Sequence, residues 1–115
     1  MSRNDLAIPA DLSAEGKAAA QKILEAAEQV LGTKVFTGGC RAFYSPEEWR
    51  RRKEEHGGNS VLVVVHDGGD LAQFFDYALG GYRAIERMQD ALKTLGLFAE
   101  SCTPWYSAIY RKDQA

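Results

Sequence analysis

Residues 60–71 read SVLVVVHDGGDL, and this stretch says more about the fold than any other. Five apolar residues at 61–65 run without a break into His66, Asp67 and two glycines. A short β-branched run that ends at glycine is typical of a buried strand. We expect its side chains to alternate between two faces of a sheet, both of them buried.

The rest of the chain follows the usual signals of capping, apolar periodicity and glycine turns. Before the strand, these signals predict a helix over 14–31, a hairpin with arms at 34–36 and 40–44, and a short helix over 46–56. After it, they predict a helix that begins at Leu71, breaks at Gly80-Gly81 and resumes to 95, and then strands at 97–102 and 105–111.

The strongest local signal is the sequence Ser45-Pro46-Glu47-Glu48. Serine at the N-cap, proline at the first helical position and glutamate three residues on form a capping box. Glutamates and arginines spaced four residues apart follow it, so we expect ion pairs along this short helix.

The order of elements predicts an α+β fold with a single, mostly antiparallel sheet of about five strands. Two long helices and one short helix are expected to pack mainly on one face of this sheet. We expect a flexible arm at 1–11, one domain at 12–111 and a short tail at 112–115.

Composition limits the possible partners and location. The chain has 115 residues and a formal charge of −2, and glutamates flank its basic run at 50–53, so nucleic-acid binding is disfavoured. The first residues lack the apolar core of a signal peptide, and no apolar run approaches the roughly 20 residues of a membrane span. We therefore expect a cytoplasmic protein with no membrane contact. Cys40 and Cys102 are too few for a disulfide framework or a cysteine zinc site.

The end of the strand supplies three potentially reactive side chains, His66, Asp67 and Asp70. They could bind a metal or act as an acid–base pair, and Cys40 could be a nucleophile with His66 as its base. However, neighbouring strand residues point to opposite faces, and Asp70 stands where it would cap a helix beginning at Leu71. We therefore expect this loop to serve the fold, with no catalytic residue, metal or cofactor. A small enzyme or metal-dependent protein that uses His66, Asp67 and Asp70 is the alternative.

Trp105 and Tyr106 lie at the tip of the last predicted hairpin. Exposed aromatic side chains near charges often anchor protein–protein interfaces, and core packing is the alternative for each. These features favour a small binding protein with a protein partner. Its candidate binding residues are Trp105, Tyr106, His66, Asp67 and Asp70. If the tip is exposed, alanine at Trp105 and Tyr106 is expected to weaken binding, whereas alanine at His66 or Asp67 is not.

Three segments, GGCRAFYSPEEW, VLVVVHDGGDLAQFF and CTPWYSAIY, resemble a group of small uncharacterised proteins of phages and mobile elements. The resemblance covers roughly residues 37–110. It implies a mobile-element context, in which the chain would modulate a host system. It implies no particular chemistry, because the group has no established activity.

Overall fold

The computed structural model describes residues 8–35, 41–53, 56–67 and 69–112. Its strands are β1 (Phe43–Tyr44), β2 (Leu62–Val65), β3 (Leu97–Thr103) and β4 (Tyr106–Arg111). Its helices are α1 (Ala14–Leu31), α2 (Pro46–Arg51), the 3-10 helix η2 (Ala72–Phe74) and α3 (Tyr77–Lys93). Within these ranges, no helix has both the length and the apolar character that a membrane crossing requires.

The predicted α+β class is confirmed, with four strands in one antiparallel sheet of order β1-β2-β4-β3. The sequence predicts about five strands, and the difference lies in the hairpin with arms at 34–36 and 40–44. Residues 34–35 are not in a strand, and the fully buried Val35 packs into the core instead. The second arm contributes β1, which pairs with β2. The predicted turn at 37–39 lies outside the described residues.

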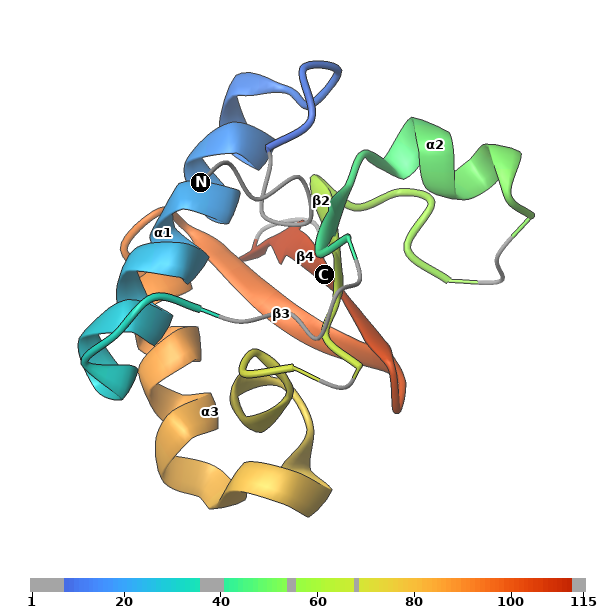
Figure 1. The fold of residues 1–115 in the computed structure, drawn as a ribbon. Helices are drawn as coiled ribbons and strands as arrows, with labels where there is room; N and C mark the ends of the chain where they lie inside the picture. The colour runs from blue at the N-terminus through green and yellow to red at the C-terminus, as the bar shows by residue number, and fades with distance from the viewer. Residues whose placement is uncertain (1–7, 36–40, 54–55, 68, 113–115) are drawn as a thin grey trace.

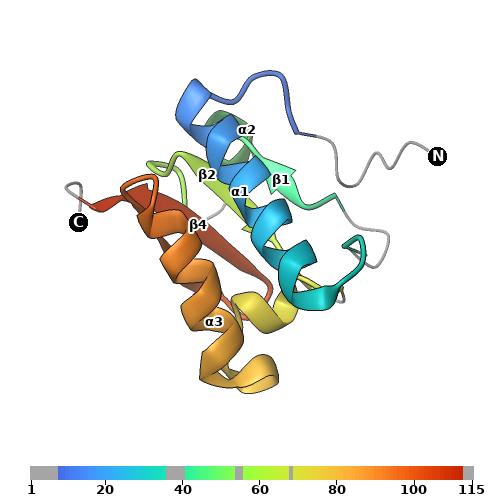
Figure 2. The ribbon, with the colours of Figure 1, turned by 90° about the vertical axis from the view of Figure 1, so that its left-hand side faces the viewer.

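The two long helices lie side by side on one face of the sheet (Figures 1 and 2). Leu62 and Val64 of β2 and Ile109 of β4 pack on that side, because side chains alternate along a strand. All three are fully buried. They share one apolar core with buried residues of α1 and α3, namely Ile23, Ala27, Met88 and Leu92.

A smaller cluster covers the opposite face, where α2 lies (Figure 1). Trp49 of α2 is fully buried against Val63 of β2 and Tyr106 of β4. The Trp49 and Tyr106 ring centroids are 4.9 Å apart in an edge-on arrangement. Strict alternation would place Val61 on this face too, but it precedes β2 and packs into the helix-side core. The two long helices thus share one face as predicted, whereas the short helix covers the opposite face, because Trp49 packs against Val63 and Tyr106 there.

The predicted boundaries of α1 are confirmed at both ends. Ser13 caps its N-terminus by accepting a hydrogen bond from the Gly16 amide at 3.0 Å. Gly32 ends the helix with a φ of 72°, a left-handed conformation that glycine adopts without strain. Gly16 also allows a close approach to the sheet, since an added Cβ would lie 2.5 Å from the Val61 carbonyl oxygen.

The predicted N-cap Ser45 begins α2, while the Glu48 side chain pairs with Arg41 rather than completing the capping box. Ser45 Oγ accepts a hydrogen bond from the Glu48 amide at 3.1 Å, as expected. The helix ends at Arg51 rather than near residue 56, and Lys53 takes a left-handed conformation with a φ of 60°. The charged run therefore supports less than two turns of helix.

The glutamates of α2 make different ion pairs from those the sequence predicts. Both carboxylate oxygens of Glu48 accept hydrogen bonds from Arg41, at 3.0 and 2.9 Å, instead of pairing with Arg52. The Arg52 guanidinium lies over the rings of Tyr44 and Trp49. A planar guanidinium stacks well on aromatic faces, so these contacts compete with the ion pair between Arg52 and Glu48 that the four-residue spacing predicts.

Ser45→Ala should lower the free energy of unfolding by about 1–2 kcal/mol, because it removes a helix cap and a buried hydrogen bond. Besides capping α2, the fully buried Ser45 hydroxyl donates a hydrogen bond to Asp11 Oδ2. Ser13→Ala is the matched control. It also removes a serine N-cap, that of α1, but Ser13 is exposed, whereas Ser45 is buried. Chemical denaturation measures both variants. Equal losses would contradict a contribution from the Asp11 contact.

The segment between β2 and α3 differs most from its prediction. Leu71 precedes only the short η2, which receives no side-chain cap, so the predicted role of Asp70 as a helix cap is wrong. The predicted break at Gly80-Gly81 is also wrong, because α3 begins at Tyr77 and continues through both glycines. An interior glycine costs only roughly 0.5–1 kcal/mol relative to alanine, and the buried apolar face of α3 offsets that.

Candidate functional site

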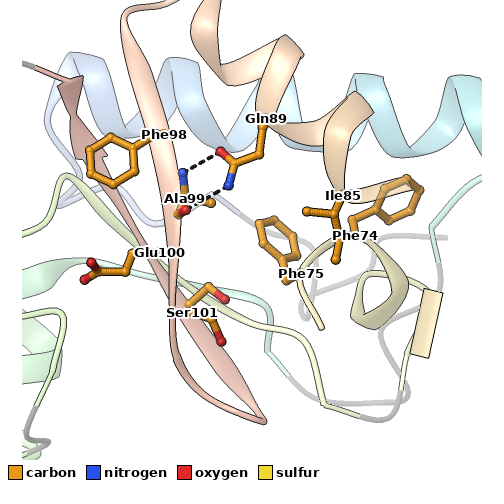
Figure 3. Close-up of a pocket in the computed structure, with 9 residues that line it drawn as sticks. Phe74, Phe75, Ile85, Gln89, Phe98, Ala99, Glu100 and Ser101 are labelled. Carbon is orange, nitrogen blue, oxygen red and sulfur yellow. Dashed lines mark hydrogen bonds between the residues drawn. The ribbon is translucent and has the colours of Figure 1, made fainter. Parts of the chain in front are cut away.

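A cavity of about 300 Å³ lies between β3 on one side and η2 and α3 on the other (Figure 3). Three apolar residues, Phe74, Phe75 and Ile85, line its helical side. The remaining lining residues are Gln89 of α3, residues 98–101 of β3 and Ser107 of β4. An apolar wall thus faces the backbone of a strand.

β3 is an edge strand, so half of its backbone groups have no neighbouring strand to bond. The Lys112 amide donates a hydrogen bond to the Gly96 carbonyl at 3.0 Å. These two residues form the next pair along the β3–β4 ladder after Leu97 and Arg111. Gly96 therefore faces β4, and so do Phe98 and Glu100, before the pairing shifts register between Ser101 and Thr103. The intervening residues, Leu97, Ala99 and Ser101, direct their amides and carbonyls outward.

The side-chain amide of Gln89 already occupies one of these outward positions (Figure 3). Its Nε2 donates to the Ala99 carbonyl at 2.9 Å, and its Oε1 accepts from the Ala99 amide at 2.9 Å. A residue of a neighbouring strand would make the same two bonds. No described side chain bonds the backbone of Ser101, the next outward residue, which also lines the cavity.

A buried polar pair adjoins the cavity through Ser107, which lines it. Ser107 Oγ lies 3.0 Å from His66 Nε2, and the two residues are only 1% and 2% exposed. The His66 ring also stacks on Phe75, with centroids 5.3 Å apart and planes inclined by 11°. Sheet register explains the pair: Val64 lies opposite Ser107, and His66 follows two residues later on the same face.

Burial lowers the pKa of His66 to about 4, although the negative charges of Asp76 and Asp67 act to raise it. The imidazole is therefore neutral at pH 7. Its buried Nδ1 finds no hydrogen-bond partner within the described residues. A neutral ring stacked on phenylalanine adds no charge beside Ser107, so Glu100 is the charged residue of the cavity lining.

The reactive side chains predicted from the loop do not come together. His66 is buried, Asp67 is exposed and Asp70 is half-buried. In the described ranges, no three residues among histidine, cysteine, aspartate and glutamate are placed to hold a metal ion. Cys40, the other nucleophile considered, lies outside those ranges. The partner of His66 is Ser107. The only sign of this in the sequence is that Ser107 is a polar residue two positions before Ile109, on the same face of the last strand.

The two aromatic residues at the β3–β4 turn pack into the protein rather than standing out from it. Tyr106 is 1% exposed, and Trp105 is half-buried with its ring centroid 5.9 Å from that of Trp49. This arrangement matches the core-packing alternative. Tyr106→Ala would therefore act on stability as well as on any binding.

Exposed side chains also lie on α3 and β3, the elements on either side of the cavity. Tyr82 is 74% exposed and lies seven residues before Gln89, which places both on the same side of α3. Glu86 lies between them on that side, and Glu100 is exposed on β3. Of these three exposed residues, Glu100 lines the cavity itself.

Comparison of the chain with models of known protein families, with curated protein sequences and with solved structures gives no match.

Proposed function

We propose that this chain is a binding protein that holds a segment of a partner protein in the cavity between β3 and α3. The observation that carries the proposal is a cavity of about 300 Å³, with apolar residues on its helical side, beside outward-facing backbone groups of an edge strand. Ligand cavities in proteins begin at about this volume and combine apolar walls with a few polar groups. The exposed Tyr82, on the same side of α3 as the lining residue Gln89, adds an aromatic group of the kind that anchors protein interfaces.

The state of His66 favours binding over catalysis. A serine hydroxyl beside an imidazole can act as an activated nucleophile, provided that the imidazole accepts its proton. The lowered pKa of His66 makes it a weak base, and its Nδ1 has no carboxylate partner among the described residues. The enzyme alternative based on His66, Asp67 and Asp70 also lacks convergence of those side chains.

A variant that fills the cavity tests the proposal. Ala99 lines the cavity and is half-buried, so Ala99→Leu should occupy part of its volume. Random dodecapeptides displayed on phage serve as the probe, selected on the immobilised protein and then made as labelled peptides. We expect Ala99→Leu to weaken their binding by roughly tenfold or more in fluorescence anisotropy, because the entering side chain loses its space.

Glu25→Leu is the control, since it adds an apolar side chain at an exposed position of α1 that does not line the cavity. It should leave affinity within roughly twofold of the parent, and thermal unfolding should show both variants folded. Equal loss in the two variants, or a selection that enriches no peptide, would refute the cavity as a binding site.

A further inference from the structure

We infer that the partner segment binds as an extended strand added to the edge of β3. In the free protein, the side chain of Gln89 occupies the position on Ala99 that this strand would take. This inference rests on the proposed function and specifies how the partner binds. Addition of a strand to an exposed sheet edge is a common mode of peptide recognition. Main-chain hydrogen bonds supply affinity in that mode, and pockets for alternate side chains supply specificity.

The hydrogen bonds of Gln89 support this mode. A glutamine side chain ends in the same amide group as a peptide unit, and here it bonds both the amide and the carbonyl of Ala99. The edge therefore already accepts one amide from outside the sheet in the geometry of a strand. An incoming strand would pair at Ser101 first and then take over Ala99 as the Gln89 side chain moves away.

The alternation of strands defines the chemistry of the partner segment. A residue opposite Ser101 would point its side chain to the helix side of the sheet, where the cavity lies. Its neighbour opposite Glu100 would point to the other face, beside an exposed carboxylate. The segment that fits is an extended peptide with an apolar residue followed or preceded directly by lysine or arginine.

Proline at the edge tests the main-chain bonds. An outward amide can be lost without breaking the sheet, so Ser101→Pro should stay folded yet bind the selected dodecapeptides roughly tenfold more weakly or worse. Ser101→Ala keeps the amide and should bind within roughly twofold of the parent. Selected peptides methylated at single backbone nitrogens test the same bonds in the unaltered protein, and every second methylation site should abolish binding.

Substitution of Gln89 tests its role as a placeholder. Gln89→Met keeps the length of the side chain but cannot make the two bonds to Ala99, so it should bind the peptides roughly three- to tenfold more tightly. Lys93→Met, one turn further along α3, is the control and should leave affinity unchanged. Unchanged or weaker binding in Gln89→Met would overturn the placeholder role.

The outcomes separate this inference from the proposed function. Peptides that respond to Ala99→Leu but not to Ser101→Pro or to N-methylation would leave the cavity in place and refute strand addition. Size-exclusion chromatography of Gln89→Met provides a further test, because an exposed edge can pair with another copy of the chain. A Gln89→Met dimer without tighter peptide binding would mean that Gln89 only protects the edge, and would refute the inference.

Discussion

Val63→Asp should lower the free energy of unfolding by about 3–5 kcal/mol, a large part of the stability of a small domain. Val63 is fully buried in the central strand β2, where it packs against Trp49 and Tyr106. Its neighbours there are aromatic and apolar, so an aspartate would be buried without a partner for its charge. Denaturation by urea, followed by circular dichroism, measures the loss.

Val30→Asp is the control for this substitution, because Val30 is 39% exposed on α1. It should change the free energy of unfolding by less than about 1 kcal/mol. If Val63→Asp proved as stable as the parent protein, the assignment of β2 as a buried central strand would be wrong.

Acid should destabilise the protein through His66 well above the pH at which most carboxylates titrate. The unfolded chain takes up a proton at this histidine near pH 6.5, whereas the folded protein does so only near its lowered pKa of about 4. The contribution of neutral His66 to the free energy of unfolding is therefore fully present above pH 6.5. It is lost as the pH falls toward 4, and the total loss is about 3 kcal/mol. Urea denaturation at a series of pH values from 7.5 to 4.5 should show this loss.

His66→Gln isolates the effect of the imidazole, since glutamine keeps a hydrogen-bonding group near Ser107 but does not titrate. Carboxylates contribute equally to both proteins, so the difference between their pH profiles belongs to His66. Parallel profiles would contradict a buried neutral histidine. A difference that grows as the pH falls from 6.5 would support it.

Features fixed by neighbouring residues could be predicted from the sequence. The caps at Ser13 and Ser45, the glycine end at Gly32 and the inward alternation of β2 are all local in the chain. The errors came where tertiary packing competes with a local preference. Two glycines do not stop α3 because its apolar face is buried, and Val35 packs into the core rather than starting a hairpin.

The candidate site could be predicted only in part. A histidine at the end of an apolar strand is a candidate site residue, so the sequence predicts a role for His66. It suggests the nearby aspartates as the partners of that histidine. Ser107 becomes its partner only through the register of β2 with β4. The bond from Gln89 to Ala99 likewise depends on how α3 lies against the edge of the sheet. Such contacts depend on topology, which a single sequence specifies weakly.

The strand order also governs when the sheet can assemble. β4 is the last strand in the chain, yet it lies between β2 and β3. During synthesis, β2 leaves the ribosome before β4, the strand with which it pairs most extensively. The apolar side chains of β2 therefore lack this partner until α3 and β3 have emerged. Closing that long loop is slow compared with forming the β3–β4 hairpin, so the hairpin should form first and β2 should dock onto it. A nascent chain that stalls before β4 would expose β2 without its main partner, which makes it a natural substrate for chaperones.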